Sequence, residues 1–433
     1  MKRSFLSRQG VLLASGLGLI AATYGLVRLA YGLFLPDVQR DLGLGAGAAG
    51  WISSGASAVY CVGAVAGLLL AARVPRVLVA AAALVAGAGA LGMATAAGPP
   101  AFGAWSVIGS AAAGLASPAL VALVARQVPD AAQGRAQAVV NAGTGPGLVA
   151  AGVLALVLLP DWRTAWAWSG AFAIVVGAVL LGASRGTSDT RDTPTRAPSA
   201  PPSPAPAPAL APAPAPSPAP SSARRWLVAH RRVLVLAVLF GAGSAVVWTY
   251  GRSALVEAGA PVVVSVSAWI ALGLGGAAVV VTARWTSGLR ARTLWTATAG
   301  SVAVAVLALG LAPQSTTLAL LACAVFGWGY TAATGSLITW TTEIAPERAS
   351  AGTSMLFVAL VLGQAVGAAA AGGLIGAVGT LATFAAGAVV TAGAAAGAAG
   401  ARVRGVAAAR SSGCTPPTPP SPRAERSRHP AAP

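Results

Sequence analysis

The sequence is poor in charge, because only 9% of its 433 residues are Asp, Glu, Lys or Arg, whereas soluble domains contain about 25%. Acidic residues are the scarcest class, with 10 against 28 basic residues, and Lys2 is the sole lysine. Hydrophobic residues make up 56% of the chain, and the mean hydropathy is +0.75. This composition excludes an ordinary soluble enzyme and predicts an integral membrane protein.

Cysteine and histidine are also rare, with three and two copies, and their positions are far apart. Cys61 and Cys323 lie in apolar runs and Cys414 in a polar tail, so no disulfide framework is indicated. His230 and His429 flank polar segments. Because no metal-ligand cluster and no Ser/His/Asp or Cys/His set can be assembled, we expect no cofactor and no enzymatic activity.

What the sequence has instead is long apolar stretches. A membrane-spanning helix needs about 20 mostly apolar residues, and twelve segments qualify. They are 11–35, 48–72, 77–97, 101–124, 136–159, 165–183, 233–256, 261–283, 293–311, 316–341, 350–375 and 380–399. We therefore expect an all-α integral membrane protein with 12 transmembrane helices in two six-helix, pseudo-symmetric halves.

The organisation along the chain is expected to be four-part. An N-terminal six-helix half covers 1–184, a Pro/Ala-rich linker 185–223, a C-terminal six-helix half 224–400, and a disordered tail 401–433. Alternating Pro and Ala over 193–222 favours an extended polyproline conformation without a core.

The basic residues indicate an orientation. With the N-terminus in the cytoplasm, 24 of the 28 fall in inner segments, as the positive-inside rule requires. Both termini and the linker are then cytoplasmic, and the Ala, Gly and Arg bias is typical of a bacterial plasma-membrane protein. The basic residues are spread over loops rather than over one folded face, so the expected partner is the lipid bilayer and not nucleic acid.

Short echoes relate the two halves. The loop "VPDAAQGRAQA" after the fourth span is matched by "APERASAGTSM" after the tenth. After the second and eighth spans, a glycine near the span end or in the loop accompanies two arginines. The residues of these two loops are Gly67, Arg73 and Arg76 in the first half and Arg284, Gly288 and Arg290 in the second.

On these motifs the chain resembles the major facilitator superfamily, whose loop between helices 2 and 3 carries an Asp-Arg motif. Ala72 and Ala283 stand where the aspartate belongs. The fourth span, with Gly114 and Pro118, and the fifth, with Gly145 and Pro146, resemble further motifs of the family, the latter typical of exporters. Spans 1 and 10–11 resemble a bacterial subgroup of the YbfB type.

The resemblance implies a secondary transporter that moves a small solute by alternating access of two rocking halves. The solute is expected near the bilayer midplane, between helices 1, 4, 7 and 10. The loop residues Gly67, Arg73, Arg76, Arg284, Gly288 and Arg290, with Gly145 and Pro146, are expected to act in gating. Two alternatives stay open: an exporter of apolar drug-like compounds, and a receptor or scaffold of the same fold that does not transport.

Two arginines lie inside predicted spans, each close to a "TYG" triplet: Arg28 in the first and Arg252 in the seventh. An arginine at a helix centre costs about 2.5–3.5 kcal/mol on insertion scales, so it normally faces a cavity or a partner. Tyr24 and Trp248 each stand four residues before an arginine, on the same helix face. These four residues are candidates for substrate binding.

Each arginine has a structural alternative. Arg28 could bond the carbonyls of a neighbouring helix, and Arg252 could reach outward to water or to Glu257. All ten acids lie at span ends or outside the spans, so no intramembrane carboxylate is expected to neutralise the arginines. A net positive cavity favours a small organic anion as solute, and the lack of a buried acid leaves the coupling ion undetermined.

The tenth span, "GWGYTAATGSLITW", adds Thr331 and Thr334, together with Tyr330, as cavity-lining candidates. The alternative is that these hydroxyls satisfy helix carbonyls and that the glycines serve close helix packing. For Asn141 and Gln364, in the fifth and eleventh spans, interhelical hydrogen bonds are as good an explanation as a ligand.

Overall fold

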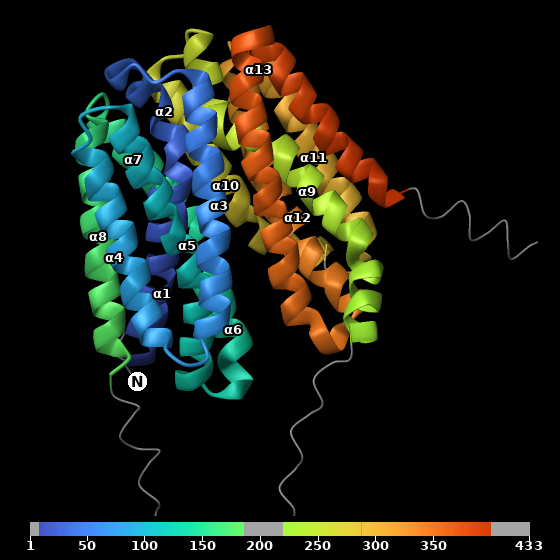
Figure 1. Ribbon diagram of the computed structural model, residues 1–433. Coiled ribbons are helices and arrows are strands. Elements are labelled where there is room, and N and C mark those ends of the chain that lie inside the picture. Colours follow the sequence, from blue (N-terminus) through green and yellow to red (C-terminus); the bar gives the residue numbers. More distant parts are fainter. Residues whose placement is uncertain (1–7, 186–219, 287, 400–433) are drawn as a thin grey trace, which may run out of the picture.

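The computed structural model describes residues 8–185, 220–286 and 288–399, and in this part of the chain every regular element is helical. Two groups of helices stand side by side (Figure 1). The end of α2 and the turn in α13 lie at one end of the bundle, which we call the α2 end. The described N-terminus and the start of α9 lie at the other, the linker end. The tail and most of the linker lie outside the described residues.

The first half contains six spans. The first is continuous from Arg8 to Leu42 and is built from α1 (Arg8–Ile20), a π-helical stretch η1 (Ala21–Leu29) and α2 (Ala30–Leu42). The others are α3 (Ala46–Leu70), α4 (Pro75–Ala94), α5 (Pro99–Gln127), the pair α6 (Asp130–Asn141) and α7 (Thr144–Leu158), and α8 (Trp162–Ala183). Asp161 caps α8 by accepting from Thr164, which holds the pKa of this carboxyl below its ordinary value.

The second half contains α9 (Pro220–Glu257), α10 (Val262–Thr286), α11 (Ala291–Leu311), α12 (Thr316–Ile344), the 3-10 turn η2 (Pro346–Arg348) and α13 (Ala349–Ala399). The 51 residues of α13 hold two spans, because Gly379 breaks the helix with φ 83° and ψ 171°. This backbone conformation is essentially restricted to glycine. The structure therefore confirms the all-α fold and twelve spans, with the eleventh and twelfth joined at this break.

The first span is longer than the sequence predicted. We expected it to end near residue 35, but α2 continues to Leu42, and Pro36 does not end it. Asp37, expected at the membrane surface, is consequently part of the helix and is buried.

Large apolar side chains point outward on many helices. Trp51, Val157 and Val280 are 70%, 74% and 75% exposed, which in water would be an aggregation hazard and in a bilayer is contact with lipid. These outward-facing apolar side chains agree with the membrane location expected from the composition.

The two halves do not pack equally along their length. One buried apolar cluster includes residues of both halves, whereas a second, which contains Leu12, Val79, Leu123 and Val140, consists of first-half residues only. The halves meet through α2 with α9, α3 with α13 and α7 with α10. Gly32 allows a close approach of α2 to α9, because a Cβ there would lie 2.0 Å from the carbonyl oxygen of Trp248.

Candidate functional site

A pocket lies between the two halves, with an empty volume of about 410 Å³ that includes space open to solvent. Its wall comes from the first span, α3, α9 and α13. The lining residues are Arg28, Leu29, Tyr31, Ser53, Ala56, Ser57, Ala245, Trp248, Thr249 and Gln364. Arg28 is the charged member, and both halves contribute, so a molecule bound here would contact both.

Arg28 is placed by contacts from both halves. Its Nη2 donates to Gln364 Oε1 at 3.1 Å, and Gln364 Nε2 donates to the hydroxyl of Tyr330 at 2.9 Å. The guanidinium carbon lies 4.5 Å from the ring centroid of Tyr60, within cation–π distance. Arg28 Nε has no hydrogen-bond partner among the described residues, so the guanidinium retains donor capacity.

An aromatic group backs the pocket on the side of the second half. The Trp248 ring packs edge-on against Tyr330 and Phe326, with centroids 5.1 and 5.5 Å apart, and against Trp269 at 6.2 Å. The indole N–H of Trp248 is buried without a partner in the described part of the chain. Trp248 is the member of this aromatic group that lines the pocket, and the other rings hold it in place beside the Arg28 charge.

Tyr24 lies one layer behind the pocket. Its hydroxyl is 3.0 Å from that of Tyr60, so Tyr24 supports the ring on which Arg28 rests rather than lining the pocket itself. Tyr31 does line the pocket, and its hydroxyl donates to the carbonyl of Ala49 at 2.9 Å.

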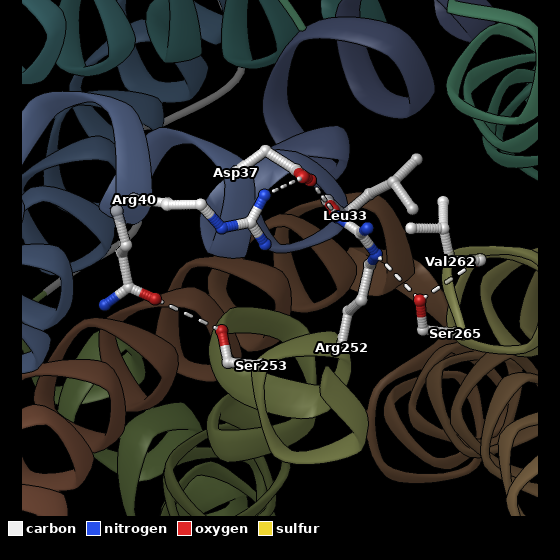
Figure 2. A network of polar contacts seen from close by, with 8 residues as sticks. Leu33, Asp37, Arg40, Arg252, Ser253, Val262 and Ser265 are labelled. Carbon is white, nitrogen blue, oxygen red and sulfur yellow. Dashed lines mark hydrogen bonds and ion pairs between the residues drawn. The ribbon is translucent and has the colours of Figure 1, made fainter. Parts of the chain in front are cut away.

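Arg252 lies outside the pocket, and our expectation about its surroundings was wrong. Its Nη1 forms a buried ion pair with Asp37 and donates to Leu33 O at 2.6 Å, while Nε donates to Ser265 Oγ at 3.2 Å (Figure 2). Side-chain exposure is 1% for Arg252 and 3% for Asp37. The arginine therefore turns toward the first half and not outward to water or to Glu257. The expected pair of unneutralised arginines is reduced to Arg28 alone.

Comparison with known proteins identifies the architecture. A family profile described as Major Facilitator Superfamily matches residues 17–360. The chain belongs to this superfamily. A search of curated proteins finds no match. The resemblance to the YbfB type remains a prediction.

Solved structures of superfamily transporters share the fold at low sequence identity. The nucleoside transporter NupG aligns with TM-score 0.70 and 12% identity, over 91% of this chain and 98% of that one. A D-xylose-proton symporter aligns at 0.65 and 16%, over 90% and 96%. A mutant of the peptide transporter POT aligns at 0.68 and 12%, over 90% and 92%. These likenesses show the fold, and membership of the superfamily makes the chain a membrane transporter rather than an enzyme.

Thr331 and Thr334 of the tenth span do not line the pocket. Thr334 Oγ1 donates to the carbonyl of Thr331 at 2.8 Å, which is the structural alternative considered for these hydroxyls. Thr331 is exposed and lies beside Gly276 of α10. From this span it is Tyr330 that reaches the Arg28 network.

The superfamily's loop motifs lie at the linker end. Within the described ranges the guanidinium groups of Arg73, Arg76 and Arg290 form no hydrogen bond or ion pair, and Arg284 stacks on Trp285 with its guanidinium carbon 3.9 Å from the ring centroid. Gly67 packs 3.1 Å from Pro118, measured from an added Cβ, and Gly288 lies in open space. That these residues act in gating stays a prediction.

Side chains of the same half form hydrogen bonds with the backbone of these two loops. Arg126 donates to the carbonyl of Ala72, the position that lacks the superfamily's aspartate. In the second half, Glu343 Oε1 accepts from the backbone N–H of Ala291 at 3.0 Å and thereby caps the start of α11.

Gly145 and Pro146 lie where α7 meets α10 of the other half. A Cβ at Gly145 would be 3.3 Å from the carbonyl oxygen of Gly273, so a small residue here permits close contact between the halves. The contact agrees with the gating role predicted for Gly145 and Pro146, which stays a prediction.

Sequence reasoning missed Tyr60, Ser53, Thr249 and Asp37. Ser53 and Thr249, with hydroxyls 3.0 Å apart, are polar residues in apolar spans, and this was an available signal. Tyr60 could have been considered as an aromatic partner for Arg28, but nothing local to the sequence pairs the second span with the first. Asp37 was discounted because its helix was expected to have ended.

Proposed function

We propose that this transporter carries a small organic anion across the plasma membrane, with Arg28 as the residue that binds the anionic group. The observation that supports this most is the position of Arg28 in a pocket between the halves whose described lining residues include no carboxylate. Asp37, the buried acid nearest in sequence, is engaged by Arg252.

The chemistry of the guanidinium agrees with this assignment. Its planar fork matches a carboxylate or phosphate in two parallel hydrogen bonds, which an ammonium group cannot reproduce. Low local dielectric strengthens the attraction of an unneutralised cation for an anion. Gln364, Ser53, Ser57 and Thr249 supply neutral polar groups around it.

Alternating access is possible because the residues of the site are divided between the two halves. Because Arg28 comes from the first half and Gln364 and Trp248 come from the second, rocking the halves apart on one side exposes a bound molecule to that side. With both termini and the linker in the cytoplasm, the α2 end faces the outside. We expect the residues at the Gly145 contact and in the loops of Arg73, Arg76, Arg284, Gly288 and Arg290 to move during this exchange.

The experiment is transport by purified protein in liposomes, with panels of small carboxylates and phosphate esters and with neutral apolar compounds. Arg28→Lys should lose most anion flux, because charge without the fork is insufficient. If Arg28→Gln protein inserts normally and carries an anion near the wild-type rate, the proposal is wrong.

A second candidate is export of an apolar compound, favoured by the Trp248 ring in the pocket and by the aromatic rings packed behind it. For such a substrate Arg28→Gln should be tolerated, whereas Trp248→Ala should reduce transport strongly. The same panel therefore separates the two candidates. A chain that carries neither class, yet binds a compound, would instead be a receptor.

A further inference from the structure

The Asp37–Arg252 ion pair joins the two halves. Asp37 is on α2 of the first half and Arg252 is on α9 of the second, 215 residues apart. Figure 2 shows the carboxylate of Asp37 directed at the Arg252 guanidinium, with Arg40 on its other side. Arg40 is 64% exposed and its Nη1 lies 3.5 Å from Asp37 Oδ1, so Arg252 provides the buried partner.

Further bonds between the halves surround this pair on the side of the α2 end. Tyr250 donates to the carbonyl of Ala46 at 2.7 Å, and the hydroxyls of Ser53 and Thr249 are 3.0 Å apart. Ser253 donates to Gln39 Oε1 at 3.4 Å. The shared apolar cluster covers the same region. The pocket is therefore closed toward the α2 end by polar and apolar contacts together.

The linker end differs. There, the guanidinium groups of Arg73, Arg76 and Arg290 form no hydrogen bond or ion pair with another described residue, and the bonds of Arg126 and Glu343 stay within their own halves. Ala72 and Ala283 supply no carboxylate to these arginines. The Asp37–Arg252 ion pair between the halves is thus at the α2 end.

We propose that the Asp37–Arg252 ion pair is a latch for the α2 end: it must break whenever the pocket opens on that side, and it sets how often this happens. Leu33 O and Ser265 Oγ complete the shell of the guanidinium in the closed arrangement. Removing one partner leaves a buried charge uncompensated, and opening to water relieves that penalty. Arg252 is on this basis a positioning residue for the transport cycle and not a ligand of the solute.

The latch can be tested without a substrate. A reporter cysteine replaces Ala56, which lines the pocket, in a chain whose three native cysteines are removed. A membrane-impermeant maleimide is then applied from the side of the membrane at which the α2 end lies. In the otherwise unchanged chain the reporter should react slowly. Asp37→Asn and Arg252→Gln should each raise the rate about ten-fold or more, because the closed state is disfavoured.

Two controls make the result specific. Arg40→Gln removes the exposed arginine beside the same carboxylate and should change the rate less than about two-fold, as exposed pairs contribute little. In the double variant Asp37→Asn/Arg252→Gln neither member of the pair is left as an uncompensated charge. Its labelling rate should therefore be lower than that of either single variant, because the effects of substitutions at contacting residues are coupled rather than additive.

Unchanged labelling in both single variants, or strictly additive effects in the double variant, would overturn the latch. If a single variant does not insert, Ser265→Ala keeps both charges and removes only the acceptor of Arg252 Nε. It should raise the rate several-fold, and an unchanged rate would count equally against the latch. None of these outcomes depends on which solute is carried.

Discussion

At the scale of residues, the two intramembrane arginines have different surroundings and therefore different expected roles. Arg28 faces a pocket and is held by the amide of Gln364 and the ring of Tyr60, both of which are neutral. Arg252 is enclosed by a carboxylate, a carbonyl and a hydroxyl. A neutral shell leaves a charge available for an anion, whereas a buried ion pair does not.

The amide of Gln364 permits a direct test of the Arg28 charge. Gln364→Glu would place a carboxylate where an amide oxygen now lies 3.1 Å from Arg28 Nη2. A neutralised guanidinium should bind an anion at least about ten-fold more weakly, or about 1.4 kcal/mol, as measured by substrate binding in detergent. Gln364→Met, which leaves the arginine charged, should stay within a few-fold of wild type. Equal anion affinity in the Glu variant would contradict a role for Arg28 as ligand.

At the scale of elements, small residues and helix irregularities set the contacts between helices. Gly32 lets α2 touch α9, and this close approach brings Asp37 to Arg252. The π-helical η1 has wider turns than an α-helix, so side-chain directions along it depart from the 3.6-residue period. The position of Arg28 in the pocket depends on the π-helical stretch, and the Asp37–Arg252 ion pair depends on the close approach at Gly32.

The break at Gly379 gives an element-scale prediction. Gly379 has φ 83° and ψ 171°, and no neighbouring atom lies within 4 Å of an added Cβ. Gly379→Ala should therefore destabilise through the backbone alone, by about 1–3 kcal/mol, and should lower the midpoint of thermal unfolding in detergent.

Gly376 is the matched control for that substitution. It lies three residues earlier in the regular part of α13, also with open space around it, and Gly376→Ala should be neutral or stabilising by up to about 1 kcal/mol. If both variants unfold alike, the positive φ at Gly379 is not the cause of any loss.

At the scale of the whole molecule, the two halves share a core toward the α2 end and separate charged loops at the linker end. In the orientation that the arginines favour, the linker end is cytoplasmic. The described ends that flank the linker, in α8 and α9, lie at this end of the bundle (Figure 1). Residues 193–219 of the linker lie outside the described residues, and α9 begins at Pro220.

The orientation is tested by cleavage at one engineered site. A recognition sequence for a specific protease, inserted between residues 200 and 210, should be cut in inside-out vesicles, because Pro- and Ala-rich segments without a core are accessible to proteases. It should survive in intact cells, and the unmodified chain should survive in both. Cleavage from outside intact cells would reverse the topology and would assign the α2 end to the cytoplasm.

The sequence by itself determined the class of protein, the twelve spans, the superfamily and the presence of Arg28 in a membrane helix. These depend on local composition and short motifs, because crossing a bilayer requires about 20 apolar residues in a row whatever lies beside them.

Only the tertiary structure decided which residues meet. The partner of Arg252 is 215 residues away, and the partner of Arg28, Gln364, is 336 residues away. Such pairs depend on which helices pack together, on close approach at Gly32 and on the continuation of α2 past Pro36. No period or motif along the chain specifies these distances, since side chains far apart in sequence are brought together by helix packing alone.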